Sequence, residues 1–265
     1  MKYFIFFTLL FFVVIGYGQN NFSKPFKDCN IDGSITIYDY HAHKWISSDI
    51  NDSHYQTLPA STFKILNSLI FLEEEIVAGE NEIVEWPENP DTVKYGNRPE
   101  IYHDMNLKEA FQLSAVWVYL NLSKKVGKEK YKQYLADCNY GNGNISVNDD
   151  DFWNFGYLGI SPVNQIEFLI DFYEETLPFS KESFKMVKEM MVEEKTDTYI
   201  LRAKTGWTKD GGKDTGWWVG YVERSENTYF FATRLVKDVE ERNPDFSKCR
   251  KEITRSILTQ MNILD

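Results

Sequence analysis

PASTFKILNSLIF, residues 59–71, has the pattern of a buried helix, because apolar side chains cover most of its surface. Its polar residues Ser61, Lys64 and Ser68 are three and four positions apart, so they share one face of that helix. A lysine is almost never fully buried without a partner. The stretch therefore predicts a lysine side chain in the protein interior, one helical turn from a serine.

Ser61 and Lys64 have the residue types and the spacing of a nucleophile and its base. A serine hydroxyl is a poor nucleophile until a base takes its proton, and burial lowers the pKa of a lysine so that its amine can be that base. Pro59 and Ala60 place Ser61 at the helix start, where free backbone N–H groups gather. The S-x-x-K motif also arises by chance, so a lysine that reaches to solvent stays an alternative.

The composition is that of a globular protein with a substantial core. The chain has 265 residues, of which 43% are hydrophobic and 16% aromatic, enough for one large domain or two small ones. Its net charge of −11 argues against binding to nucleic acid or to an anionic membrane. The charge says nothing about catalysis.

The N-terminus has the layout of an export signal. Residues 3–15 are almost unbroken apolar and are followed by a site of small residues, as in a secretory signal peptide cleaved near Gly18–Gln19. The run is short for a membrane span. We predict a signal peptide over residues 1–18 and an exported, periplasmic domain over residues 19–265, with no stable membrane anchor after cleavage.

The periodicity of apolar residues predicts one sheet built from both chain ends. Residues 33–46 alternate as a hairpin does, and residues from about 73 to 195 are mainly helical in pattern. The later strands are expected at 198–208, 216–225 and 227–236, and a final helix at about 247–261. We predict a mixed α/β fold in which an antiparallel sheet has flanking helices and the helical region of about 73–195 is an insertion.

Individual boundaries follow from the same patterns. Ser247 is the candidate N-cap of the final helix. The helices expected within the inserted region cover residues 107–127, 128–138, 161–176 and 181–194.

Three further motifs contain residues that can do chemistry. Lys204-Thr205-Gly206 lies in a predicted strand, where a glycine indicates close approach to the backbone. A cation and a hydroxyl beside such a strand suit an anionic, amide-containing ligand. Ser114 and Val116 lie in a helical stretch, where a core serine bonded to its own backbone is the alternative. Tyr-Gly-Asn occurs at Tyr95–Asn97 and again at Tyr140–Asn142, and each copy is compatible with a simple turn.

The order of the motifs is more informative than any one of them. The chain reads Ser61-x-x-Lys64, Ser114-x-Val116, Tyr140-Gly141-Asn142 and Lys204-Thr205-Gly206. In this it resembles the class D (oxacillinase-type) serine β-lactamases, over roughly residues 34–260. The second Tyr-Gly-Asn falls where the family has its own, whereas the copy at Tyr95–Asn97 looks like a coincidence. The chain has no S-D-N, which argues against class A.

The resemblance implies a β-lactamase/transpeptidase-like fold and a hydrolase that opens the ring of penicillin-type antibiotics. It implies that Ser61 becomes an acyl ester, that Lys64 is the base, and that Ser114 passes a proton to the lactam nitrogen. It also implies a group of substrate-binding residues, with oxyanion donors in the backbone N–H groups of Ser61 and Trp207. That group comprises Lys204, Thr205, Gly206, Trp207 and Arg250; the alternative for Arg250 is a solvated helix charge.

The family also implies that Lys64 carries CO2 as a carbamate, which is an anionic base. Trp153 matches the tryptophan that supports this group, and Val116 matches a covering valine; a core tryptophan is the alternative for Trp153. Neither a metal nor another cofactor is expected. Where the family usually has leucine after this tryptophan, the chain has Asn154. An amide there draws in water and favours the ammonium, unless it points away.

Two other functions fit part of the pattern. A β-lactam sensor domain is acylated without turnover, but it needs a transmembrane relay that this sequence is not expected to have. A penicillin-binding transpeptidase or carboxypeptidase usually carries S-x-N in the middle motif, which Val116 contradicts. The sequence leaves open the range of β-lactams, the oligomeric state and the pairing of Cys29, Cys138 and Cys249, for which free thiols are the simpler expectation.

Overall fold

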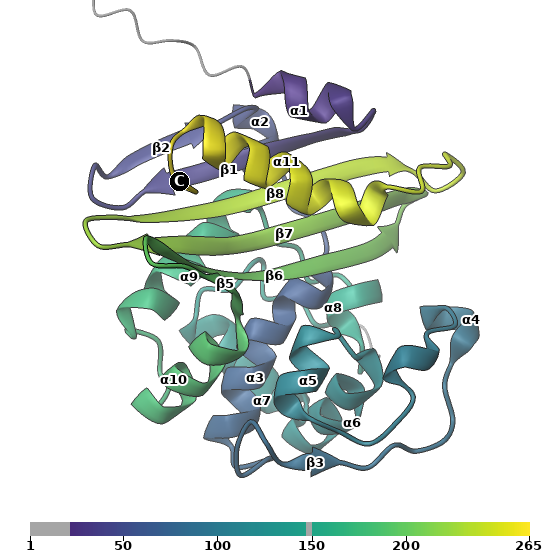
Figure 1. Cartoon of the computed structure of the whole chain (residues 1–265). Coiled ribbons are helices and arrows are strands. Elements are labelled where there is room, and N and C mark those ends of the chain that lie inside the picture. The colour runs from purple at the N-terminus through teal and green to yellow at the C-terminus, as the bar shows by residue number, and fades with distance from the viewer. Residues whose placement is uncertain (1–21, 147–149) are drawn as a thin grey trace, which may run out of the picture.

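The computed structural model describes residues 22–146 and 150–265 (Figure 1). The predicted signal peptide over residues 1–18 lies outside these ranges. Of the helices within them, none combines the length and the apolar character that crossing a bilayer requires.

An antiparallel sheet of six strands, in the order β2-β1-β8-β7-β6-β5, forms the middle layer (Figure 1). Two of its strands come from the N-terminal part of the chain and four from the C-terminal part, which confirms the predicted sheet from both chain ends. The strands are β1 (Asp32–Asp39), β2 (Lys44–Ser47), β5 (Val192–Lys195), β6 (Tyr199–Asp210), β7 (Lys213–Arg224) and β8 (Thr228–Asp238). A separate small hairpin joins β3 (Ile83–Val84) to β4 (Met105–Asn106).

Helices cover both faces of the sheet (Figure 1). The helices α1 (Ser23–Asp28) and α11 (Phe246–Gln260) lie on one face, and the inserted region lies on the other. Strand β7 is central and buried on both faces, because Trp217 faces the inserted region and Trp218 faces α11. The remaining helices are α2 (Ile50–Ser53), η1 (Ala60–Phe63), α3 (Lys64–Glu73), α4 (Thr92–Tyr95), η2 (Pro99–Ile101), α5 (Leu107–Gln112), α6 (Val116–Val126), α7 (Lys128–Asp137), α8 (Phe152–Phe155), α9 (Pro162–Glu174) and α10 (Lys181–Met190).

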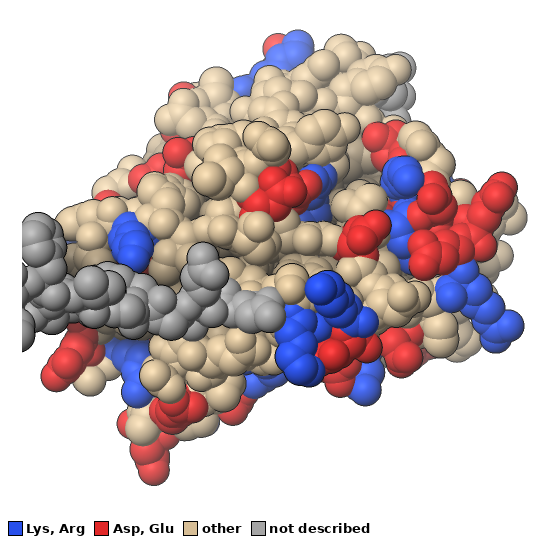
Figure 2. Space-filling view, turned by 90° about the horizontal axis from the view of Figure 1, so that it is seen from above, with Lys and Arg blue, Asp and Glu red and all other residues tan. Residues whose placement is uncertain are grey.

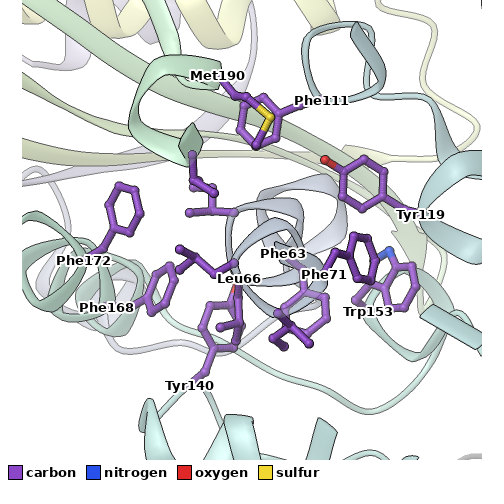
Figure 3. Close-up of a cluster of buried hydrophobic side chains, with 14 of the residues drawn as sticks. Phe63, Leu66, Phe71, Phe111, Tyr119, Tyr140, Trp153, Phe168, Phe172 and Met190 are labelled. Carbon is purple, nitrogen blue, oxygen red and sulfur yellow. The ribbon is translucent and has the colours of Figure 1, made fainter. Parts of the chain in front are cut away.

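The α3 helix forms the centre of the larger core, as its sequence predicts. Every residue from Lys64 to Phe71 is buried. Aromatic side chains from several elements surround it, and Figure 3 shows Phe63, Tyr140 and Trp153 among them. A second core lies between the sheet and α11. The S-x-x-K turn is therefore anchored in the best-packed part of the molecule.

Three predicted boundaries are wrong. The helix expected over 107–127 is two helices, with a break at residues 113–115 where Ser114 has a positive φ of 56°. The helix expected over 181–194 ends at Met190, because residues 192–195 pair with β6 as the edge strand β5. Ser247 does not cap α11, which begins at Phe246.

The cysteines also depart from the expectation of free thiols. Cys29, which follows α1, forms a disulfide with Cys249 on α11, whereas Cys138 is free and buried. The bond ties the N-terminal helix to the last helix on the outer face of the sheet. Figure 2 views the molecule from that side and shows Lys and Arg side chains next to Asp and Glu rather than a basic patch.

Candidate active site

The turn that carries Ser61 is held tightly against the sheet. Ala60, directly before it, has a positive φ of 52°, an uncommon conformation for a non-glycine residue. The Trp217 indole N–H donates to the Leu58 carbonyl at 3.0 Å. A side chain on Gly206 of β6 would lie 2.9 Å from the Pro59 carbonyl oxygen, so this position requires glycine. The close approach predicted at Gly206 is thus made by the nucleophile turn itself.

Lys64 is buried beside that serine. Its Nζ donates to Ser61 Oγ at 3.2 Å and lies 4.7 Å from the centre of the Tyr119 ring. Its side chain is fully inaccessible to solvent. Burial lowers the pKa of Lys64 to about 8, against the opposing influence of Asp151. At mildly alkaline pH, Lys64 can therefore present a neutral amine to the serine hydroxyl.

A second buried lysine in this region also donates to a serine. Ser114 lies in the break between α5 and α6, and Lys204 Nζ on β6 donates to its Oγ at 3.0 Å. Lys204 is buried, which holds its pKa well below the usual range, and the charges of Lys64 and Arg250 act in the same direction. The positive φ of Ser114 is a strained conformation of the kind that gathers at functional sites, at a cost of about 1–3 kcal/mol.

Helix α11 brings Arg250 to the same strand. Its guanidinium donates to the Gly206 carbonyl and to Ser247 Oγ, the latter at 2.7 Å. Gly216 on β7 leaves room for it, because a side chain there would lie 3.1 Å from Arg250 Cδ. The side chain is buried, so the alternative of a solvated helix charge is wrong.

Trp207 follows the glycine on β6 and is about half exposed at 45%. Its indole N–H donates to Asp214 at 2.8 Å, and Asp214 in turn forms a buried ion pair with Lys237 at 2.6 Å. The ring also lies against Phe246, with ring centres 5.2 Å apart. The tryptophan is therefore fixed in orientation although one side of it is open.

These elements surround a cavity of about 700 Å³. Seven of the predicted site residues line it: Ser61, Ser114, Val116, Thr205, Gly206, Trp207 and Arg250. Four cations, Lys94, Arg98, Lys209 and Arg250, also face it, and among the described residues that line it there is no carboxylate. A protein of net charge −11 thus has a cavity suited to an anionic ligand.

Trp153 lies within the core rather than at the cavity surface. It is fully buried, and its ring centre is 5.6 Å from that of Phe63. Its indole Nε1 is buried without a hydrogen-bond partner among the described residues. Indole nitrogen is only a donor, and a buried donor without an acceptor is costly. The arrangement therefore suits an additional acceptor at this point of the core.

Asn154 is among the residues that line the cavity, and its side chain is bonded to a neighbouring carboxylate. Its side-chain amide donates to the carboxylate of Asp151 at 2.6 Å, and its side chain is buried. Asp151 also accepts from the Tyr95 hydroxyl at 2.6 Å. Burial raises the pKa of Asp151 to about 6, although these donors and the charge of Lys64 oppose that shift.

Sequence reasoning missed Asp151 and the contact that Tyr95 makes with it. Tyr95, treated above as part of a coincidence, lines the cavity and holds Asp151. The copy at Tyr140–Asn142 lies outside the cavity lining and organises a loop instead, since Asn142 Oδ1 accepts from the Gly159 N–H at 3.0 Å. The run of three aspartates at 149–151 was the one available signal for Asp151.

Comparison with known proteins agrees with this geometry. Residues 30–259 match the family model described as the penicillin binding protein transpeptidase domain. The chain is 36% identical to β-lactamase OXA-20 of Pseudomonas aeruginosa, over 97% of this chain and 96% of that protein. The chain belongs to the class D β-lactamases. The class D β-lactamase structure from Sebaldella termitidis superposes with a TM-score of 0.87 at 45% identity, covering 92% of this chain and 97% of that one.

A second relative agrees. This β-lactamase is 33% identical to OXA-48 of Klebsiella pneumoniae, over 93% of this chain and 89% of that protein. The family model and the solved structures together confirm the predicted transpeptidase-like fold.

Proposed function

We propose that this class D β-lactamase is exported, that it is acylated on Ser61, and that a carbamylated Lys64 is the base for both acylation and hydrolysis. The single observation that carries the proposal is the contact of 3.2 Å between Nζ of the buried Lys64 and Oγ of Ser61, which lines a cationic cavity. A solvent-exposed lysine would hold its proton and could not take one from serine.

Ring opening begins with attack by Ser61 Oγ on the lactam carbonyl while the base at position 64 takes the hydroxyl proton. The backbone N–H groups of Ser61 and Trp207 are the proposed oxyanion donors, and the packing of the Ser61 turn on Gly206 supports their closeness. Loss of one such donor costs about 3 kcal/mol of transition-state stabilisation. Ser114, bonded to Lys204, passes a proton to the departing lactam nitrogen.

The substrate carboxylate binds at the opposite end of the cavity. Thr205 and Arg250 line it, and Arg250 is held by Ser247 and the Gly206 carbonyl. A guanidinium presents a fork of donors that matches a carboxylate. This contact orients the lactam carbonyl toward Ser61 without taking part in proton transfer.

The residues around Lys64 fit a carbamate. The unpartnered Trp153 Nε1 supplies a buried donor, and the lowered pKa of Lys64 supplies a neutral amine. Val116, at the start of α6, lines the cavity and is the proposed cover of this group. The carbamate would supply an anionic base, which a buried ammonium cannot be.

Export is supported by the bond between Cys29 and Cys249, since disulfides persist in oxidising compartments. It agrees with the predicted signal peptide over residues 1–18 and with a periplasmic location.

Hydrolysis of a chromogenic cephalosporin tests the enzymatic part of the proposal. We expect many equivalents of product per protein, with a rate that rises when bicarbonate is added to CO2-depleted buffer. Release of a single equivalent would identify a sensor domain instead. Cleavage of a cell-wall peptide in place of the cephalosporin would identify a transpeptidase or carboxypeptidase.

A further inference from the structure

The turn that contains Ser61 is supported from behind by a buried glutamine, which the proposed mechanism does not use. Gln165 lies near the start of α9, and only 1% of its surface is exposed. Its side-chain amide donates to Thr62 Oγ1 at 2.8 Å, and Thr62 directly follows Ser61 in the chain. A buried amide is costly unless it is hydrogen-bonded, so this contact holds α9 and the residue next to Ser61 together.

The direction of this hydrogen bond follows from the other bond of the same hydroxyl. Thr62 Oγ1 donates to the Pro59 carbonyl at 2.7 Å, and a carbonyl oxygen can only accept. A hydroxyl has a single hydrogen, so Thr62 Oγ1 must be the acceptor of its bond to Gln165. The two bonds therefore form a chain from Gln165 through Thr62 to Pro59.

This chain closes the turn in which Ser61 lies. The Thr62 N–H also donates to the Pro59 carbonyl, at 3.2 Å, so the two ends of the segment 59–62 are joined around Ala60 and Ser61. Ala60 has a positive φ of 52°. Such a strained conformation persists only where the surrounding structure enforces it, and the bond from Gln165 is one of the contacts that do so.

The start of α9 is itself well anchored, so it can act as a rigid support. Two backbone hydrogen bonds, of 3.1 and 2.8 Å, pair Thr57 with Ile160 just before the helix. Asn164, in the first turn of α9, accepts from the Gly141 N–H at 2.6 Å and donates to the Asn139 carbonyl at 3.1 Å. The loop of the second Tyr-Gly-Asn motif, which does not line the cavity, therefore braces the helix that carries the glutamine.

We propose that Gln165 is a positioning residue for acylation: through Thr62 it holds the nucleophile Oγ and the backbone N–H of Ser61 in the reactive geometry. The inference rests on the acylation of Ser61 proposed above. Gln165 is not among the residues that line the cavity, so it acts on the reaction only through the turn.

This role predicts an effect on the chemical step and none on binding. Thr205 and Arg250, the proposed contacts of the substrate carboxylate, belong to β6 and α11 and not to the turn. Displacement of a reacting group by about 1 Å costs about 10²-fold in rate. The smaller shift that follows from one missing hydrogen bond should cost about tenfold.

Rapid-quench intact mass spectrometry with a slowly hydrolysed penicillin tests the proposal, because its concentration dependence separates the limiting acylation rate from the half-saturating concentration. Gln165→Met removes the donor and keeps an unbranched side chain. We expect its limiting rate to fall about tenfold while the half-saturating concentration stays the same. Thr62→Val should lose at least as much, and the double variant no more than Thr62→Val, because both changes break one chain.

Ser183→Ala is the matched control. It also removes a hydrogen bond of a buried side chain, the one of 3.0 Å from Ser183 Oγ to Glu73, but it lies on α10 and outside the cavity lining. We expect it to be acylated at the wild-type rate. A loss in Ser183→Ala as large as in Gln165→Met would show a general effect of destabilisation and would overturn the positioning role.

The remaining outcomes separate this inference from the proposed function. An unchanged limiting rate in Gln165→Met, a loss that lies wholly in the half-saturating concentration, or losses that multiply in the double variant overturn the role of Gln165 alone. If Gln165→Met does not fold, a wild-type limiting rate in Thr62→Val overturns it. A wild type in which peptide mapping finds no adduct on Ser61 overturns the proposed function together with this inference.

Discussion

The cavity has two walls, and each contains a buried lysine that donates to a serine. Lys64 bonds to Ser61 at 3.2 Å on the helical side, and Lys204 bonds to Ser114 at 3.0 Å on the sheet side. Burial lowers the pKa of both lysines. As hydrogen-bonded pairs the two are nearly equivalent.

Their surroundings make them different. Lys204 also donates to the Thr205 carbonyl. It lies on the same strand as Gly206, whose carbonyl accepts from Arg250. Lys204 and Arg250 are therefore part of one cationic wall, which is the proposed anion-binding wall. Lys64 lies against the Tyr119 ring, and the charge of Asp151 favours its ammonium form. The larger core also contains the Trp153 indole N–H, which has no acceptor among the described residues. Under the proposed function, the same type of side chain binds an anion on one wall and becomes one on the other.

The largest expected effect separates the two serines. Ser61→Ala removes the nucleophile, so we expect no covalent adduct with a slowly hydrolysed penicillin and a fall in kcat of about 10⁴-fold or more. Ser114→Ala keeps the nucleophile and is acylated, although more slowly. Intact mass spectrometry checks both variants. An adduct that persists in Ser61→Ala would mean that the two pairs have exchanged roles.

The next effect separates the two lysines by their response to bicarbonate. Lys64→Ala removes the base, so turnover of the cephalosporin is lost and bicarbonate does not restore it. Lys204→Ala weakens substrate binding and proton relay, but its residual activity still rises when bicarbonate is added to CO2-depleted buffer. Steady-state kinetics with and without bicarbonate measure this difference. A bicarbonate response that disappears in both variants would contradict the division between the walls.

Much of this comparison was predictable from sequence. The motif Ser61-x-x-Lys64 in an apolar helix indicated a buried lysine, and the strand patterns indicated which segments form the sheet. Local sequence patterns were enough to predict these elements, because α3 and β7 are buried on nearly all sides and their residues are therefore mostly apolar. The order of the motifs then identified seven of the residues that line the cavity.

The remaining features depend on tertiary structure. Tyr95 and Asp151 are 56 residues apart and meet only in the folded chain. The break at Ser114 interrupts a helical pattern with a conformation that local propensity disfavours. Similarly, Cys29 and Cys249 are 220 residues apart and pair because α1 and α11 lie on the same face of the sheet.

A smaller effect tests the anion-binding wall. Arg250 lines the cavity, and its hydrogen bonds to described residues go to Ser247 and the Gly206 carbonyl rather than to either serine–lysine pair. Arg250→Ala should therefore raise KM for carboxylate-bearing β-lactams by about tenfold or more, the size of a hydrogen bond to a charged group, with little change in kcat. Equal losses in kcat and kcat/KM would place the arginine in the chemical step instead.

The smallest expected effect concerns stability and returns to the wall that contains Lys64. A buried ammonium is costly even with a nearby carboxylate, and an apolar side chain of similar volume often fits such a place better. We expect Lys64→Met to be inactive but more stable than the wild type, by about 1–3 kcal/mol in CO2-depleted buffer at pH 7. Urea unfolding measures this difference in the free energy of unfolding.

Two conditions should reduce that difference. The native pKa of Lys64 is about 8 against an ordinary 10.5, so between these values the unfolded chain binds more protons at this site and wild-type stability rises with pH. The advantage of Lys64→Met is therefore complete below about pH 8 and shrinks above it. Bicarbonate has the same effect at pH 7, because CO2 bound only to the native protein stabilises the wild type and not the variant. If Lys64→Met is instead less stable at pH 7 without CO2, the ammonium is well paired in the core, and the site was built to hold a cation as the Lys204 wall is.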